Sequence, residues 1–190
     1  MSLGDRSSCQ LDTSKLVELL QQSAVEHLTT FRQLQAQQFG HGRVIATTDY
    51  EALYAYKRGE HRRCLQLSQR NVCALADDLE SFSSVLAFPE FIQLMDDEIV
   101  SLAGLMLLVD PACREHTRHV GISQRSLSLY LMTQCLMKLG LHRSSTLLDV
   151  TLNCIEDARR PVLGLITLDQ LLLKLTEQKI RSRIVEDADQ

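Results

Sequence analysis

The stretch Lys57-Arg58-Gly59-Glu60-His61-Arg62 has a near copy in Lys138-Leu139-Gly140-Leu141-His142-Arg143, and both fit the pattern Lys-x-Gly-x-His-Arg. Each copy lies between two stretches in which leucine recurs at helical spacing. A glycine that closes one helix just before another begins is typical of a tight helical hairpin. Two such turns in one chain predict helix pairs that stack side by side, as in helical repeat proteins.

The composition favours an all-α fold. The chain has 190 residues, of which 45% are hydrophobic, so it can bury a core. Leucine outnumbers valine and isoleucine, prolines and glycines are few, and tryptophan is absent. Leucine favours helices, whereas β-branched residues favour strands. We therefore expect an all-α protein with about seven helices arranged as antiparallel hairpins.

Helical periodicity and capping signals place these helices along the chain. Thr48 and Glu51 have the spacing of a capping box, and Ser123 is a candidate N-cap. Pro89 and Pro161 suit the first turn of a helix, where the missing amide proton is not needed. The expected helices are residues 12–37, 48–58, 60–79, 89–109, 123–139, 144–158 and a last helix that opens at Pro161.

The chain is expected to form one domain with short polar ends. We expect residues 1–11 to be a disordered leader, residues 12–180 a single helical repeat-like domain, and residues 181–190 a frayed acidic tail. The first and last helices carry long apolar faces, whereas the terminal units of a solenoid normally have a polar outer side. The chain is therefore expected to pair with a second copy or to belong to a larger protein.

Several properties predict a cytoplasmic location, with the nucleus as an alternative. The longest uncharged apolar run, residues 99–109, is about half the roughly twenty residues of a membrane span, so we expect a buried core helix there and no membrane partner. The six cysteines show no Cys-x-x-Cys pair, which favours free, mostly buried thiols in a reducing compartment. A net charge of −4 does not favour nucleic acid as a partner.

The second and third expected helices resemble one tetratricopeptide repeat, a family that packs two antiparallel helices over about 34 residues. The segment from Tyr56 to His61 is similar to that family's turn, which is typically aromatic-Lys-x-Gly-acidic-aromatic. The fifth and sixth expected helices resemble a second, degenerate copy. The small residues at the matching positions are Ala52, Ala55, Gly59 and Cys64 in the first copy, and Thr133, Gly140 and Ser145 in the second. The resemblance implies a right-handed superhelical stack.

The resemblance also implies a function. Proteins of this kind usually bind other proteins and rarely do chemistry, so the resemblance implies a non-enzymatic scaffold or adaptor that binds a partner peptide or helix in a concave groove. The first helix of each pair lines that groove. The implied partner-binding residues are Asp49, Leu53, Tyr56, Lys57, Tyr130, Gln134, Met137 and Lys138. Some members of the family bind the C-terminal carboxylate of a peptide with a set of Lys, Asn and Arg side chains. Asp49 and Leu53 occupy two of the matching positions and cannot bind a carboxylate in this way, so we do not expect the ligand to be the C-terminus of a peptide.

One alternative is binding of nucleic acid or an anionic surface through the basic hairpin of residues 57–70. Five cations gather there, and such clusters contact RNA phosphates or acidic lipids. Glutamates lie close by in the sequence, and no aromatic platform accompanies the cations, so a solvated helix face is the simpler interpretation. The five cations are Lys57, Arg58, Arg62, Arg63 and Arg70.

The sequence contains no convincing catalytic or metal-binding motif. Cys113, His116 and His119 have the residue types of a zinc site, but a fourth ligand is missing and two arginines lie among them. No nucleophile elbow, phosphate-binding glycine loop or His-Glu-x-x-His motif occurs. The acidic run Asp96-Asp97-Glu98 is explained by the helix dipole. We therefore expect no enzyme activity, cofactor or metal; a small metal-dependent hydrolase with a dispersed site is the remaining alternative.

Overall fold

The structure is a computed structural model of the chain, and it describes residues 15–16, 18–19, 21–23, 26, 42–75, 94–109, 121–141, 145–159 and 168–188. Within these residues there is no β-strand, so the all-α prediction is confirmed for this part of the chain. The described residues between 15 and 26 are also helical. The helices with described bounds are α2 (Gly42–Lys57), α3 (His61–Ala74), α5 (Asp97–Val109), α7 (Gln124–Lys138), α8 (Ser145–Ala158) and α9 (Leu168–Ala188).

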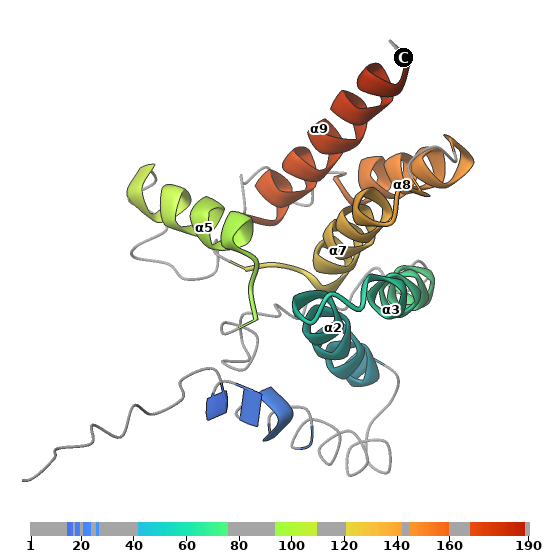
Figure 1. Cartoon of the computed structure of the whole chain (residues 1–190). Helices are drawn as coiled ribbons and strands as arrows, with labels where there is room; N and C mark the ends of the chain where they lie inside the picture. Colours follow the sequence, from blue (N-terminus) through green and yellow to red (C-terminus); the bar gives the residue numbers. More distant parts are fainter. Residues whose placement is uncertain are drawn as a thin grey trace, which may run out of the picture.

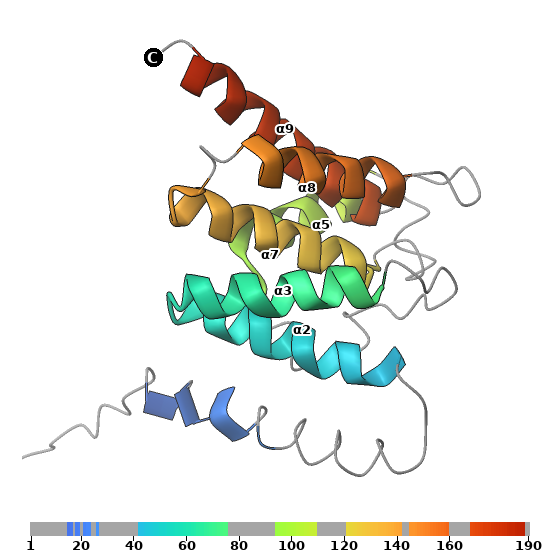
Figure 2. The same ribbon diagram turned by 90° about the vertical axis from the view of Figure 1, so that its right-hand side faces the viewer.

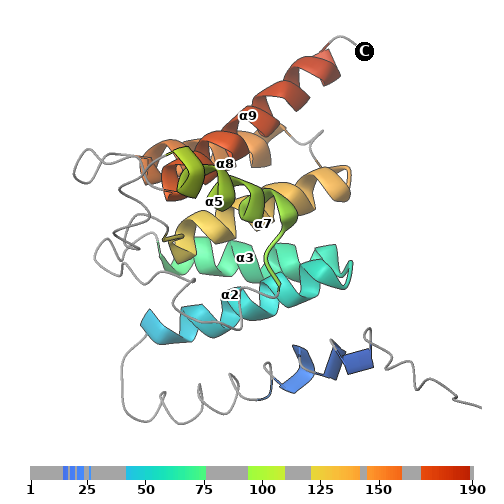
Figure 3. The ribbon, with the colours of Figure 1, turned by 90° about the vertical axis from the view of Figure 1, so that its left-hand side faces the viewer.

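The helices stack in layers. α2 packs against α3, α7 packs against α8 and also against α3, and α9 packs beyond them on α7 and α8 (Figure 2). Figure 1 shows α2, α7 and α9 in a row, with α3 and α8 on one side of the row and α5 on the other. Figure 3, seen from the opposite side to Figure 2, has α5 in front of α7. One face of the row is thus covered by α3 and α8, and α5 lies on the other.

The helix α7 forms the centre of the core. Twelve of its fifteen residues are buried, and it contacts α2, α3, α8 and α9. An amphipathic surface helix buries only one stripe, whereas α7 is enclosed on almost every side. Its short polar side chains, Ser126, Ser128 and Thr133, are buried among leucines, where they let neighbouring helices approach closely.

Both repeated glycines lie at turns between helices, as the repeated pattern predicts. Gly59 and Gly140 have φ angles of 76° and 67°, in the left-handed region that glycine adopts without a Cβ penalty. The amide of Gly59 donates to the carbonyl of Tyr56 at 3.0 Å, and the amide of Glu60 donates to the carbonyl of Ala55 at 2.9 Å. These two bonds satisfy the last carbonyls of α2 and reverse the chain into α3.

Two predicted helix starts are wrong. α2 already begins at Gly42, so Thr48 lies inside the helix and does not cap it with Glu51. Residues 94–96 are not helical, so no continuous helix runs from Pro89 to Val109. α5 begins at Asp97 because the Asp96 carboxylate accepts a hydrogen bond from the Glu98 amide at 3.1 Å, which is an N-cap contact.

The start of α7 is as predicted. The Ser123 hydroxyl accepts a hydrogen bond from the amide of Ser126 at 3.1 Å, which caps the helix. The same hydroxyl donates to the carboxylate of Asp169 at 3.2 Å, and Asp169 also accepts from the backbone amide of Ser123 at 2.8 Å. The cap therefore ties the start of α7 to the start of α9. The predicted start at Pro161 lies outside the described residues.

The expectation that residues 99–109 form a buried core helix is only partly correct. Ile99 and Met106 are buried, but Leu105 is 58% exposed and Leu108 is 70% exposed. The reason is that α5 lies on the outside of the layered helices, and its principal packing partner is α9. Among the described residues, no helix is long and apolar enough to cross a membrane.

The chain end and the cysteines also differ in part from expectation. α9 stays helical as far as Ala188, through most of the segment expected to fray. Cys64 and Cys135 are buried free thiols, as predicted, whereas Cys73 is exposed. A hydrogen bond with Cys64 and, to a smaller extent, burial raise the pKa of the Cys135 thiol, so it stays protonated. Cys9 and Cys113 lie outside the described residues.

Candidate functional site

Seven of the eight residues predicted to bind a partner lie in three different environments. One group is enclosed in the core, a second surrounds the start of α5, and a third lines a pocket between α7 and α9. Lys57, at the end of α2, is exposed and belongs to none of these groups. The predicted residues therefore do not form one continuous open groove.

Asp49 and Leu53 belong to the enclosed group. Both are 0% exposed, because α7 packs over this part of α2, so the expectation that they face an open groove does not hold. The Asp49 carboxylate accepts hydrogen bonds from Asn71 of α3 at 2.8 Å and from Ser128 of α7 at 2.6 Å. Burial raises the pKa of Asp49 from 3.8 to about 7, although both bonds oppose this rise. Asp49 joins three helices instead of contacting a partner.

In the second group, Tyr130 and Gln134 contact the side chain of Glu98 at the start of α5. The Glu98 carboxylate accepts hydrogen bonds from the Tyr130 hydroxyl at 2.9 Å and from the Gln134 amide at 3.2 Å. The ammonium group of Lys179, from α9, lies 2.6 Å and 2.5 Å from its two oxygens. The same ammonium lies 5.9 Å from the centroid of the Tyr130 ring, within range of a cation–π contact. Side chains from two helices thus converge on one carboxylate.

The hydroxyl of Tyr56 binds a second carboxylate beside the first. Tyr56, from α2, hydrogen-bonds Asp96, two residues before Glu98. Burial raises the pKa of both Tyr56 and Tyr130, and the negative charge of Asp96 raises each of them further. Both hydroxyls therefore stay protonated at neutral pH and remain hydrogen-bond donors. They are suited to donating hydrogen bonds to carboxylates of another chain segment and unsuited to act as bases.

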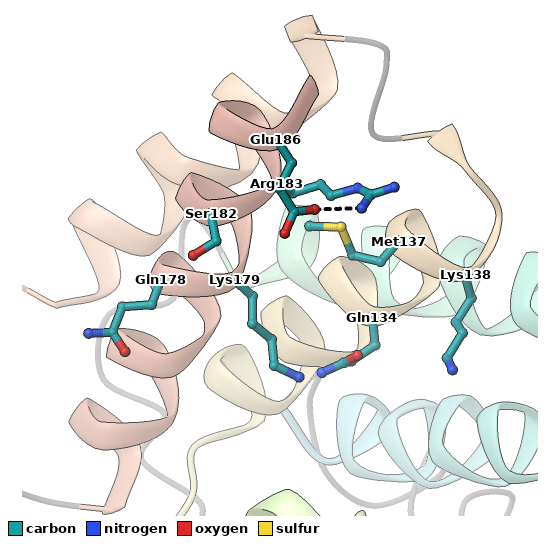
Figure 4. A pocket seen from close by; sticks show the side chains of 8 residues that line it. All are labelled: Gln134, Met137, Lys138, Gln178, Lys179, Ser182, Arg183 and Glu186. Atoms are coloured by element: carbon teal, nitrogen blue, oxygen red, sulfur yellow. Dashed lines mark hydrogen bonds and ion pairs between the residues drawn. The ribbon is translucent and has the colours of Figure 1, made fainter. Parts of the chain in front are cut away.

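The third group lines a pocket of about 570 Å³ between the C-terminal half of α7 and α9. Three of the predicted residues, Gln134, Met137 and Lys138, are on its α7 side. Figure 4 shows Met137 next to the ion pair between Arg183 and Glu186, whose side chains lie 2.6 Å apart. The other lining residues are Gln178, Lys179 and Ser182.

The prediction missed the residues that α9 and the start of α5 contribute. Lys179 and Arg183 lie four residues apart and so share one face of α9. That spacing was visible in the sequence, but it does not reveal which helix the face meets. The role of Glu98 was also missed, because an acidic first turn is already explained by the helix dipole. Gln134 and Lys179 contact Glu98 and also line the pocket, so the two places adjoin.

The structure does not support the other two candidate sites, the Cys/His cluster and the basic hairpin. The Cys113, His116 and His119 cluster lies outside the described residues. Within the described ranges, no group of three or more His, Cys, Asp or Glu side chains could hold a metal ion. In the basic hairpin, Arg58 pairs with Glu18 at 3.1 Å and with Glu60 at 3.6 Å. Part of the hairpin's positive charge is therefore neutralised within the chain.

The tetratricopeptide resemblance stays a prediction. The turns at Gly59 and Gly140 and the packing of α2 on α3 and of α7 on α8 agree with paired helices, but pairing alone is common to many helical folds. Comparison of the chain with protein-family models, with curated proteins and with solved structures finds no match.

Proposed function

We propose that the chain is a non-enzymatic scaffold or adaptor, and that it binds a segment of a partner protein along the face formed by α2, α7 and α9. The observation that carries this proposal is the 570 Å³ pocket between α7 and α9, which includes three of the residues that the sequence assigned to partner binding. A pocket of this size holds a few side chains of a peptide.

The chemistry of the pocket favours an acidic segment with an apolar residue. Lys138, Lys179 and Arg183 supply three positive charges to the lining, and Glu186 supplies one negative charge. Within the chain Lys179 pairs with Glu98 and Arg183 pairs with Glu186, so an acidic partner would take the place of these internal carboxylates. Met137 supplies a flexible apolar surface of the kind that adapts to varied side chains. A positive surface attracts a negative partner and discourages a positive one, which gives specificity as well as faster association.

The basic hairpin is the weaker candidate for a binding surface. Arg58 and Arg63 both form ion pairs with Glu60, which lowers the net charge available to a phosphate backbone. Nucleic-acid binding depends on positive charge left over for phosphates. A salt-dependent shift of an RNA oligonucleotide by the wild-type chain, removed by charge reversal in the hairpin, would favour this alternative instead.

Charge reversal in the pocket is expected to abolish partner capture. In the double variant Lys138→Glu and Arg183→Glu, two attractive contacts become repulsive. We expect at least a tenfold loss of captured partner, which corresponds to about 1.4 kcal/mol. The measurement is quantitative mass spectrometry of proteins captured from a lysate by the tagged chain.

The matched control is the double variant Arg62→Glu and Lys174→Glu. Both side chains are exposed and lie outside the pocket lining, and the change in net charge is the same. Partners that depend on the pocket are retained by the wild type and by this control and are lost from the pocket variant. Equal capture by all three proteins would contradict the proposed function.

A further inference from the structure

We infer that residues 94–98 are an internal ligand of the proposed binding face, and that the partner is a protein segment with the same chemistry: an apolar pair followed by two carboxylates in alternate positions. Partner binding and docking of α5 then exclude each other. This inference rests on the proposed function, because it names the partner's chemistry and what the partner must displace.

The contacts of the two carboxylates carry the inference. Tyr56 of α2 binds Asp96. Tyr130 of α7 and Lys179 of α9 bind Glu98, at 2.9 Å and 2.5 Å. Each helix of the row that forms the proposed face therefore contributes a donor. A capping or dipole contact would involve α5 alone, whereas these donors lie far away in the sequence and converge on one segment.

Apolar anchors precede the carboxylates. Leu94 is 0% exposed and Met95 is 6% exposed, and both belong to the main hydrophobic core. Their backbone is not helical, so the segment meets the helices as a peptide would, with two buried side chains ahead of two bound carboxylates. The local order Leu-Met-Asp-Asp-Glu defines the recognition chemistry we assign to the partner.

The rest of α5 is held weakly in comparison with α7. Among its residues only Ile99 and Met106 are buried, whereas twelve residues of α7 are buried. Elements with few buried apolar contacts open at lower free energy than the core. α5 can therefore leave the face while α7 stays folded, and its departure frees the donors on Tyr130, Gln134 and Lys179.

The pocket continues the site that the internal ligand occupies. Gln134 and Lys179 bind Glu98 and also line the pocket, and Lys138 and Arg183 extend the positive surface beyond them. An acidic partner segment in the pocket would therefore meet Glu98 directly, and the two negative groups would compete for Lys179. This adjacency makes competition the expected outcome of binding.

A fluorescent peptide with the sequence of residues 94–104, blocked at both ends, tests the inference by anisotropy. The receptor is the full chain, either wild type or with Asp96→Asn and Glu98→Gln. If the internal ligand occupies the face about 99% of the time, freeing it raises apparent affinity up to about a hundredfold. We expect at least a tenfold tighter peptide Kd for the double variant, and no binding of a peptide that carries the same two amides.

Two further variants make the outcome decisive. Glu98→Gln alone changes one half-buried side chain, and it should tighten the peptide in the same direction if the double variant does not fold. Adding Lys179→Ala to either receptor should remove most of that gain, whereas Lys174→Ala should not. A peptide Kd that is unchanged or weaker in both carboxylate variants overturns the inference.

The proposed function can fail separately. If the peptide binds no receptor while partner capture still depends on Lys138 and Arg183, the partner has different chemistry and only the inference fails. If the peptide gains affinity as expected but capture is insensitive to those two residues, the pocket is not the partner's site and the proposed function fails.

Discussion

Asp49→Asn is expected to remove a strong pH dependence from the stability of the protein. Burial raises the pKa of Asp49 from 3.8 to about 7, so the folded state holds a proton that the unfolded state releases. Below about pH 4 the carboxyl is protonated in both states and costs nothing. As the pH rises toward 7, only the unfolded chain ionises, so the free energy of unfolding falls; above pH 7 it levels off.

The size of this effect follows from the shift in pKa. At about 1.4 kcal/mol for each pKa unit, the wild type loses about 4 kcal/mol of stability between pH 4 and pH 8 through this group. Asparagine does not titrate, so the stability of the Asp49→Asn variant relative to the wild type should rise by about 4 kcal/mol over that range. Urea unfolding at several pH values, followed by circular dichroism, gives this difference.

A constant offset between the two proteins does not affect the test. The new amide group replaces a buried oxygen that has no hydrogen-bond partner among the described residues, and its cost of about 1–3 kcal/mol is the same at every pH. Asp97→Asn is the control, because Asp97 is exposed at the start of α5 and this variant keeps the buried Asp49 carboxyl, so it should keep the fall in stability that Asp49 causes. Parallel profiles for wild type and Asp49→Asn would contradict the assignment of Asp49 as a buried, protonated link between helices.

Substitution on opposite sides of α7 should be equally damaging. Leu129 and Leu131 are two residues apart, so their side chains point to nearly opposite sides of the helix. Both are 0% exposed, because neighbouring helices enclose this middle part of α7. Replacement of either by alanine leaves a cavity, and we expect each variant to lose about 2–5 kcal/mol in urea unfolding.

Leu105→Ala is the matched control for this pair. The same side-chain atoms are removed, but Leu105 is 58% exposed on α5, so the expected change is within about 0.5 kcal/mol. If either Leu129→Ala or Leu131→Ala behaved like this control, α7 would be an amphipathic surface helix and the central position assigned to it would be wrong.

The sequence predicted the features of the fold that short-range chemistry decides. Gly59 and Gly140 identify turns because their positive φ angles favour glycine whatever surrounds them. Ser123 identifies a helix start because its hydroxyl binds an amide only three residues away. The start of α2 was placed too late, because Thr48 and Glu51 have the spacing of a capping box although both lie inside the helix.

The candidate site was harder to predict, because contacts between distant segments decide it. Glu98 and Lys179 are 81 residues apart, and nothing local to either residue indicates the other. Asp49 and Leu53 are buried because α7 packs on α2, and the local sequence around them does not show which helix packs there. Gln134, Met137 and Lys138 do line the pocket. Residues three and four apart share one face of a helix, so a sequence can predict that they lie together even when it does not show what the face contacts.

Hydrogen–deuterium exchange of the full chain, with and without a saturating amount of the peptide of residues 94–104, tests the central claim most directly. We predict that the peptide speeds exchange in α5, because the internal ligand is displaced, and slows it in α9 around residues 178–186. Exchange in α7 should stay slow in both samples. Bound peptide with unchanged or slower exchange in α5 would contradict the claim that the two compete for one face.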